Sequence, residues 1–335
     1  AETSSGAGGG GGQTDRKRVE SRFKTISMEK YSGGSRSLSG RISKERNLTG
    51  EEVEQVKITC IALDLDGTTL NPQGRLGRRN REAIKKALDA GIQVVAASGR
   101  SLDSLPKDIL EIEGIQYGIT SNGAAVYRLS DRKCLKQSRL SGDSVNEILV
   151  CAEKEEVVFE AFIKGKPYAQ KEYVEDPVSF GASERAIPYI QSTREPVADM
   201  ETFIRENQDK LDCLDIVVKS EEKKRDLWKT LQENVKDVYI TSSVPQLLEI
   251  SHRDSGKDAG IRFLLEYLGL NREGLAAFGD GDNDKELLAY ARIGIAMENA
   301  SPECKRAADW IAPSNDRAGV AWGIEKLLGI ESFEL

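Results

Sequence analysis

Two aspartates, Asp64 and Asp66, end an apolar run that begins at Cys60, and a glycine and two threonines follow them. Carboxylates this close raise each other's free energy of ionisation unless a cation or a proton intervenes. The stretch CIALDLDGTTLN therefore indicates a site that holds something positive. Taken alone it is a weak signal, because aspartates after strands also serve as turn formers and helix caps.

Two further apolar runs end in polar residues. The run IQVVAA is followed by Ser98, Gly99 and Arg100, and the run GLAAFG is followed by DGDND, residues 280–284. Lys257 opens the helical pattern that leads into the second of these runs. Because parallel α/β sheets bind ligands beyond the carboxyl ends of their strands, we expect all three ends at one site. Together the three ends are a strong signal.

A calcium-binding loop is excluded for both aspartate clusters. Counted from Asp280, the sixth position of such a loop should be glycine but is Lys285, and the twelfth should be glutamate but is Ala291. The stretch that starts at Asp64 fails at the same two positions. We interpret Asp282 as a turn or helix-capping residue.

The pattern around these residues is that of an α/β fold. A strand over KITCIALDL is followed by a helix over 79–90 that stops at Gly91, and then by the strand IQVVAAS. Later, a helix that ends at Gly269 precedes the strand GLAAFG, the helix KELLAYAR, the strand IGIAM and a last strand near Trp310. Strands that are apolar throughout and alternate with helices predict a Rossmann-like parallel sheet covered on both faces.

The segment 135–248 has a different pattern. EVVFEAFIKGKPYAQ predicts a hairpin that turns at 165–167, and CLDIVVK, DVYIT and QLLEIS predict strands around a charged amphipathic helix. This α+β pattern interrupts the α/β one. We therefore predict a discontinuous core, 56–134 and 249–335, with an inserted cap domain at 135–248.

Residues 1–55 contain a glycine run and Ser-rich stretches with hardly any large apolar residue. Such a segment buries too little apolar area to offset its ordering entropy, so we predict disorder. A leader rich in serine and containing arginine is compatible with import into an organelle such as a plastid, and a processed N-terminus would look similar. Without import, the chain is expected in the cytoplasm.

Composition excludes several classes of protein. The single histidine, His252, rules out sites that need two, and we interpret it as structural. No apolar run approaches the roughly 18 residues of a membrane span, and the net charge of −7 argues against a nucleic-acid partner. The cysteines are odd in number and form no CxxC, which favours free thiols in a reducing, intracellular compartment. They are Cys60, Cys134, Cys151, Cys213 and Cys304.

The motifs together resemble the haloacid dehalogenase (HAD) superfamily and, within it, the Cof-type phosphatases with an α/β (C2-type) cap. The resemblance covers about residues 57–330 and rests on DLDGTTLN, VVAASGR, SNGA, SGKDAG, AAFGDGDNDKELL and IGIAMENA. Two departures are minor: Thr69 stands where the family usually has leucine, and SGKDAG replaces the commoner SKG around Lys257. Within the cap only the general pattern matches.

The resemblance implies roles for the residues at the strand ends. Asp64 attacks phosphorus and forms an aspartyl-phosphate, and Asp66 carries a proton to the leaving oxygen and later takes one from water. Mg²⁺ lies on the carboxylates of Asp64 and Asp280 and on the backbone carbonyl of Asp66.

The same resemblance implies how phosphate is held. Ser98, the Gly99 amide, Lys257 and Asn283 contact its oxygens. Asp284 holds Lys257 or a metal-bound water. Two further residues, Asn122 and Arg100, line the substrate pocket, and the cap closes over it to exclude water.

We therefore predict a Mg²⁺-dependent phosphatase of a small phosphorylated metabolite. Sugar phosphates, flavin or flavin-precursor phosphates and pyridoxal phosphate are all open. A phosphotransferase, which passes the group to an acceptor other than water, is the rival within the enzyme class. A non-catalytic module that docks a larger assembly is the rival outside it, although such a module need not keep all the catalytic motifs together.

Overall fold

The computed structural model of this chain describes residues 57–330. The predictions made for residues 1–55, disorder and an import leader, lie outside this range. Within it, no helix is both long enough and apolar enough to cross a membrane.

The described residues contain an eight-stranded sheet whose strand order is β14-β13-β12-β1-β2-β3-β4-β5. The strands from β14 to β3 are parallel, and β4 and β5 add an antiparallel edge. This confirms the predicted α/β class, while the antiparallel edge was not predicted. The strands are β1 (Cys60–Leu63), β2 (Gln93–Ala97), β3 (Tyr117–Thr120), β4 (Ala125–Arg128), β5 (Lys133–Gln137), β12 (Leu275–Gly279), β13 (Ile293–Met297) and β14 (Trp310–Ala312).

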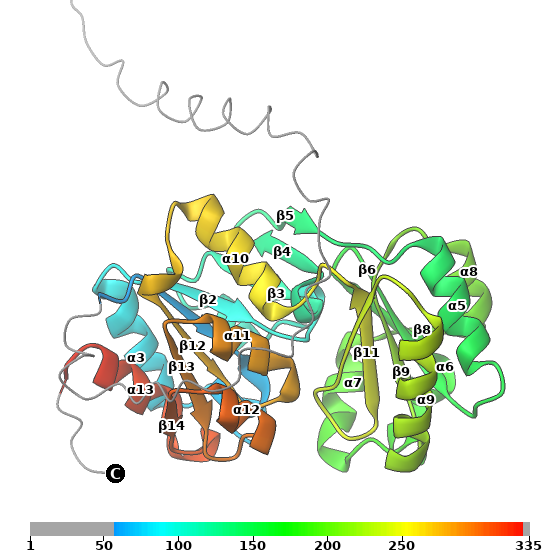
Figure 1. Ribbon diagram of the computed structural model, residues 1–335. Helices are drawn as coiled ribbons and strands as arrows, with labels where there is room; N and C mark the ends of the chain where they lie inside the picture. The colour runs from blue at the N-terminus through cyan, green and yellow to red at the C-terminus, as the bar shows by residue number, and fades with distance from the viewer. Residues whose placement is uncertain (1–56, 331–335) are drawn as a thin grey trace, which may run out of the picture. The chain divides into compact units, whose positions relative to one another are not determined.

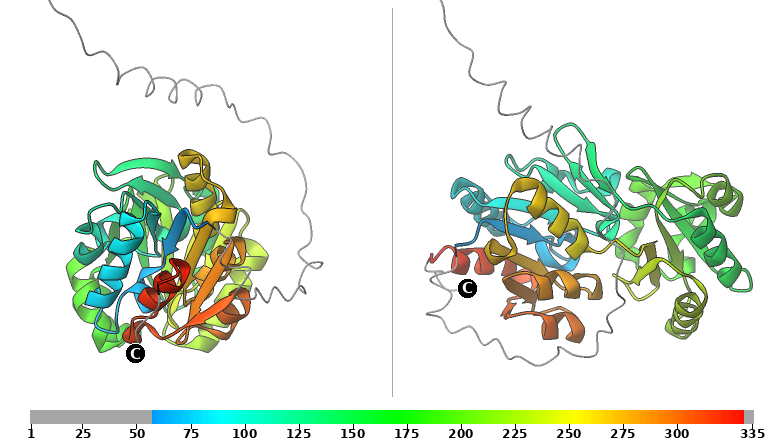
Figure 2. Two further views of the ribbon diagram at one scale, coloured as in Figure 1. Left: turned by 90° about the vertical axis from the view of Figure 1, so that its left-hand side faces the viewer. Right: turned by 45° about the horizontal axis from the view of Figure 1, so that its top comes forward.

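Helices cover both faces of this sheet. α3 and α13 pack together, and α10, α11 and α12 form a second group (Figures 1 and 2). The strands between them are buried, apart from the half-buried Gln93 that begins β2, as strands covered on both faces must be. The helices are α3 (Arg78–Asp89), α4 (Lys107–Leu110), α10 (Lys257–Leu268), α11 (Lys285–Tyr290), α12 (Pro302–Ala307) and α13 (Gly319–Leu327).

Local sequence explains where these helices begin and end. In α3 the apolar residues Ala83, Ile84 and Ala87 recur at helical spacing and are buried. Gly91, just past its end, has a φ of +79°, which glycine adopts without steric cost. α10 ends in the same way at Gly269, with a φ of +68°.

A second, six-stranded sheet has the order β10-β11-β9-β6-β7-β8. All its pairs are antiparallel except β7–β8. The predicted hairpin is present as β6 and β7. The strands are β6 (Val158–Ile163), β7 (Lys166–Gln170), β8 (Glu195–Val197), β9 (Leu211–Val217), β10 (Val238–Thr241) and β11 (Leu247–His252).

Apolar residues on one face of this second sheet pack with α5, α8 and α9 in one core cluster. Part of the other face packs with α6 and α7 in a smaller cluster. The helices are α5 (Gly142–Ala152), α6 (Lys171–Glu175), α7 (Ile187–Thr193), α8 (Met200–Glu206) and α9 (Glu221–Asn234).

The positions at which the chain passes from one sheet to the other indicate where the inserted domain begins and ends. β5 belongs to the eight-stranded sheet and runs to Gln137, and β11 belongs to the six-stranded sheet and runs to His252. The chain therefore leaves the eight-stranded sheet after Gln137 and the six-stranded sheet after His252, a few residues later than the predicted domain limits of 135 and 248. We propose that the insertion, called the cap below, spans residues 138–252, and that the remaining described residues form the core.

Candidate active site

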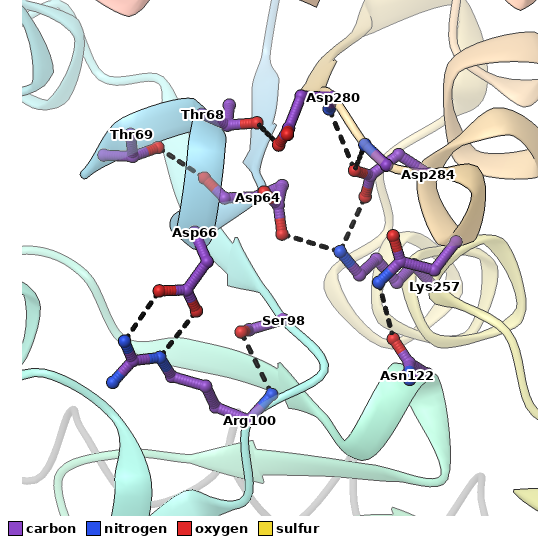
Figure 3. Close-up of polar contacts among 12 residues, drawn as sticks. Asp64, Asp66, Thr68, Thr69, Ser98, Arg100, Asn122, Lys257, Asp280 and Asp284 are labelled. Carbon is purple, nitrogen blue, oxygen red and sulfur yellow. Dashed lines mark hydrogen bonds and ion pairs between the residues drawn. The ribbon is translucent and has the colours of Figure 1, made fainter. Parts of the chain in front are cut away.

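Three adjacent strands of the core place polar residues at one edge of the sheet. β1 pairs in parallel with β12 on one side and with β2 on the other. The first residues after these strands are Asp64, Asp280 and Ser98, so the topology brings them to the same edge (Figure 3).

Lys257, the first residue of α10, joins two carboxylates at this edge. Its Nζ donates to Asp64 Oδ1 at 2.6 Å and to Asp284 Oδ1 at 2.6 Å (Figure 3). Lys257 is 1% exposed, Asp284 1% and Asp64 5%, so the network is almost fully desolvated. Asp284 Oδ2 accepts from the amides of Asp280 and Gly281, both at 3.0 Å, which closes the turn after β12.

The site carries more negative charge than one lysine balances. Burial, and then the charges of Asp284 and Asp280, raise the pKa of Asp64 well above its usual range against the opposing effect of Lys257. Burial and Asp284 raise the pKa of Asp280 to about 6, although a hydrogen bond from Thr68 opposes this. Burial alone would lower the pKa of Lys257, but Asp284 and Asp64 outweigh it and keep the lysine charged. A bound cation would favour the ionised carboxylates.

The donor set fits Mg²⁺. Carboxylate oxygens of Asp64, Asp280 and Asp284 lie within 4.8 Å of one another, and hard oxygen ligands are what Mg²⁺ prefers. Both oxygens of Asp284 already accept hydrogen bonds, so Asp64 and Asp280 are the better ligands. Thr68 Oγ1 donates to Asp280 Oδ1 at 2.7 Å and orients that carboxylate.

A glycine leaves room beside this carboxylate. Gly67 has a φ of +79°, and a Cβ built on it would lie 2.3 Å from Asp280 Oδ2. Only glycine therefore lets the turn after β1 approach Asp280 so closely. The second threonine, Thr69, donates to the carbonyl of Asp64 at 2.5 Å and ties the turn back to the strand end.

Asp66 lies apart from the lysine network and is held by Arg100. The Arg100 Nε and Nη2 atoms donate to the two carboxylate oxygens of Asp66, each at 2.6 Å (Figure 3). The Asp66 side chain is 54% exposed, whereas that of Arg100 is 13% exposed. Arg100 also donates to the Ser104 carbonyl at 3.0 Å, and its guanidinium lies 4.2 Å from the ring centroid of Tyr189 in α7. The two adjacent carboxylates thus have different partners.

The SNGA stretch packs between the core strands and Lys257. Asn122 has a φ of +51°, a left-handed conformation that asparagine tolerates. A Cβ on Gly123 would lie 1.9 Å from the carbonyl oxygen of Gly256, which precedes the lysine. Asn122 Oδ1 accepts from Asn283 Nδ2 at 3.0 Å, and its Nδ2 donates to Glu249 Oε1 at 2.9 Å.

The other predicted phosphate-binding residues lie beside this asparagine. A Cβ on Gly99 would lie 3.2 Å from Asn122 Oδ1 and 2.9 Å from Glu249 Oε1. Ser98 is buried, and its Oγ accepts from the Arg100 amide at 3.1 Å. Gly99 and Asn283 therefore both lie beside the Asn122 side chain.

The structure gathers all ten predicted site residues at this edge, and it places Arg100 against Asp66. Sequence reasoning missed Thr68 and Glu249. Thr68 could have been found, because a hydroxyl two residues after the second aspartate lies within the turn. Glu249 carried no local signal.

Of the residues interpreted as structural, Asp282 accepts from Ser301 Oγ at 2.6 Å, and His252 Nδ1 accepts from a backbone amide at 3.2 Å. The cysteines are free, as expected.

Comparisons with known proteins agree with this geometry. The model of the haloacid dehalogenase-like hydrolase family matches residues 61–324. Among curated proteins, 5-amino-6-(5-phospho-D-ribitylamino)uracil phosphatase YwtE of Bacillus subtilis is 30% identical over 80% of this chain and 98% of its own length. Phosphatase YwpJ of the same organism is 28% identical over 80% of this chain and 99% of its own length.

A solved structure of a haloacid dehalogenase-like hydrolase from B. subtilis superimposes with a TM-score of 0.71 at 26% identity. The match covers 80% of this chain and 99% of the other. The similarity therefore includes the cap as well as the core.

Proposed function

The chain belongs to the haloacid dehalogenase-like hydrolases and is a phosphatase, and on that premise we propose that it hydrolyses a small phosphorylated metabolite with Mg²⁺ through an aspartyl-phosphate intermediate. The observation that carries the proposal is the arrangement of the buried Asp64 and Lys257 with the half-buried Asp280 at the adjacent ends of β1 and β12. Phosphate monoester hydrolysis is among the slowest uncatalysed reactions, so several effects must combine at such a site.

We assign the metal to the carboxylates of Asp64 and Asp280 and the backbone carbonyl of Asp66. When bound, Mg²⁺ neutralises charge on the transferring phosphoryl group and keeps the carboxylates ionised. Thr68 and Gly67 support this assignment, because one orients the Asp280 carboxylate and the other leaves space beside it. Asp284 acts by holding Lys257 and the turn after β12.

Asp64 is the nucleophile. An oxygen of its carboxylate forms a bond to phosphorus while the bond to the leaving oxygen breaks, and water later cleaves the acyl phosphate. Lys257 holds Asp64 Oδ1 and supplies positive charge close to the incoming phosphate. Ser98, the Gly99 amide and Asn283 contact the remaining phosphate oxygens.

Asp66 moves the proton. It donates a proton to the leaving oxygen in the first step and takes one from the attacking water in the second. Its exposure supports this role, because a proton carrier must reach both solvent and substrate. Arg100 orients the carboxylate through two hydrogen bonds, and Arg100 is in turn packed against Tyr189 of the cap.

The test is phosphate release from a panel of sugar phosphates, flavin and flavin-precursor phosphates and pyridoxal phosphate, with Mg²⁺ and with EDTA. We expect release that EDTA abolishes. Asp64→Asn should abolish it as well, whereas Asp282→Asn is the matched control in the same sheet edge and should remain active. Activity in Asp64→Asn would refute the nucleophile.

The same panel separates the rival functions. A phosphotransferase would form the acyl phosphate, release little inorganic phosphate, and transfer the phosphoryl group to an added acceptor alcohol as a new phosphate ester. A non-catalytic module would form no acyl phosphate and release no phosphate from any compound. Either result would refute the proposed hydrolysis.

A further inference from the structure

Asn299, in the stretch IGIAMENA, contacts the turn that follows β1. Its Nδ2 donates to the carbonyl oxygen of Gly67 at 2.8 Å, and its Oδ1 accepts from the backbone amide of Asn315 at 3.0 Å. The Asn315 side chain donates to the carbonyl oxygen of Leu70 at 2.8 Å. Two linked asparagines, one after β13 and one after β14, therefore hold the turn at two points.

A third asparagine holds a carbonyl between these two points. Asn80 in α3 is 2% exposed. Its Nδ2 donates to the carbonyl oxygen of Thr69 at 3.0 Å, and its Oδ1 accepts from the amide of Ala321 in α13 at 3.0 Å. An asparagine side chain suits this task because it offers both donors and an acceptor, so it can link a carbonyl to an amide of another segment. We call Asn80, Asn299 and Asn315 the asparagine clamp.

The segment that provides Asn299 also holds the second turn of the site, the one after β12. The Ser301 amide donates to the carbonyl oxygen of Asp280 at 2.9 Å. Gly67, whose carbonyl Asn299 holds, lies so close to Asp280 that a Cβ built on it would be 2.3 Å from Oδ2. Residues 299–301 thus link the turn after β1 to the turn after β12.

The clamp bonds lie around the carbonyl group of Asp66, the one that we assign to the metal. The preceding carbonyl, of Leu65, accepts from the Leu70 amide at 2.9 Å, and the following one, of Gly67, accepts from Asn299. Among the hydrogen bonds of the described residues, none from outside the turn reaches the Asp66 carbonyl oxygen. This carbonyl is thus fixed through its neighbours, and no other segment competes with a cation for its oxygen.

We propose that Asn299 is a positioning residue for Mg²⁺, assisted by Asn315. It holds the turn after β1 so that the carbonyl of Asp66 and the carboxylate of Asp280 keep the relative placement that the ion requires. The proposal rests on the phosphatase function and its metal assignment. Asn299 acts through the carbonyl of Gly67 and is itself not a ligand. Groups that orient metal ligands in this way typically change metal affinity by about 10- to 100-fold when they are removed.

A purely structural role is the alternative, because the carbonyls of an irregular turn need donors for stability alone. The two roles differ in their effect on ion binding. Loss of structural support lowers the stability of the protein but leaves its affinity for each ion unchanged. Loss of positioning weakens Mg²⁺ more than Ca²⁺, because Mg²⁺ demands near-ideal octahedral geometry whereas Ca²⁺ accepts flexible arrangements of oxygen ligands.

The test is a titration of the full-length protein with MgCl₂ or CaCl₂, without substrate, followed by the melting temperature. The rise in melting temperature with ion concentration gives the dissociation constant of each ion. Asn299 is exposed, so Asn299→Ala should keep a native circular dichroism spectrum. We expect its dissociation constant for Mg²⁺ to rise by about tenfold or more, and that for Ca²⁺ to rise by a smaller factor. Asn315→Ala should shift both constants in the same sense.

Asn234→Ala is the matched control, because this exposed asparagine also donates to a carbonyl, that of Thr230 in α9 at 2.8 Å, but lies in the cap. Its dissociation constants should equal those of the wild type. An unchanged Mg²⁺ constant in Asn299→Ala, or an equal rise for both ions, would overturn the inference and leave the phosphatase intact. A wild-type protein whose melting temperature does not respond to Mg²⁺ would overturn the metal assignment as well.

Discussion

Replacing Lys257 by methionine tests how much the buried network depends on its one cation. The lysine is 1% exposed and donates at 2.6 Å to both Asp64 and Asp284. Methionine fills much of the same space but supplies neither charge nor donors. Two desolvated carboxylates then lose their partner, and the breaking of a buried pair costs about 3–5 kcal/mol. This is a large part of the roughly 5–15 kcal/mol that stabilises an ordinary domain.

The measurement is urea unfolding followed by circular dichroism, in EDTA so that no metal replaces the lost charge. Lys257→Met should lower the free energy of unfolding by about 3–5 kcal/mol. Lys285→Met, an exposed lysine that begins α11 nearby, is the control and should behave like the wild type. Adding Mg²⁺ should restore part of the loss in Lys257→Met, because the ion returns positive charge to the carboxylates.

A double variant separates this electrostatic effect from simple loss of packing. Asp284→Asn keeps an acceptor for the amides of Asp280 and Gly281 but removes one of the stranded charges. Lys257→Met combined with Asp284→Asn should therefore be more stable than Lys257→Met alone, by about 0.5–3 kcal/mol. If the single variant lies within about 1 kcal/mol of the wild type, or the double variant is no more stable than the single one, the electrostatic account is wrong.

Three further predictions concern other parts of the site. Arg100→Ala frees the proposed proton carrier from two hydrogen bonds, so kcat/KM should fall by about tenfold to 100-fold while circular dichroism stays native, and unchanged kinetics would refute the positioning role. Gly67→Ala should raise the Mg²⁺ concentration for half-maximal activity, because its Cβ would displace Asp280. Gly74→Ala controls for backbone strain, since Gly74 has a similar φ of +69° but nothing within 4 Å of a Cβ. This control variant should need the same Mg²⁺ concentration as the wild type. Asp215→Asn should raise the melting temperature more at pH 8 than at pH 5. The folded protein holds the Asp215 proton above the usual value of 3.8, so wild-type stability falls by up to about 1.4 kcal/mol per pH unit as pH rises towards the folded pKa, and asparagine avoids this loss. A pH-independent difference between variant and wild type would contradict the raised pKa.

Much of the core and of its site could be predicted from short stretches of sequence. Continuous apolar residues identify the buried strands, and the residue after each strand must lie at the sheet edge. Asp64, Ser98 and Asp280 follow three such strands, so their proximity needs only the rule that parallel strands align their carboxyl ends. Gly91 marked the end of α3 for an equally local reason, the ease with which glycine adopts a positive φ.

Tertiary structure decided which partner each of these side chains has. Asp64 and Asp66 are two residues apart, yet Lys257 holds one and Arg100 holds the other, because β1 has ended and the backbone leaves the extended conformation at Leu65, between them. Both carboxylate oxygens of Asp284 accept hydrogen bonds, so Asp284 is a poorer metal ligand than Asp280.

In the cap, too, the sequence predicts the strands but not which side chains lie opposite one another. From the sequence, QLLEIS and CLDIVVK could be recognised as strands, but nothing in either stretch reveals that Glu249 lies opposite Asp215. That pairing depends on the register between strands some thirty residues apart, and a shift of one residue would send the carboxylates to the opposite face. Local sequence thus determined the strands and the catalytic edge, whereas cross-strand register, which only the folded chain defines, brought Glu249 and Asp215 side by side.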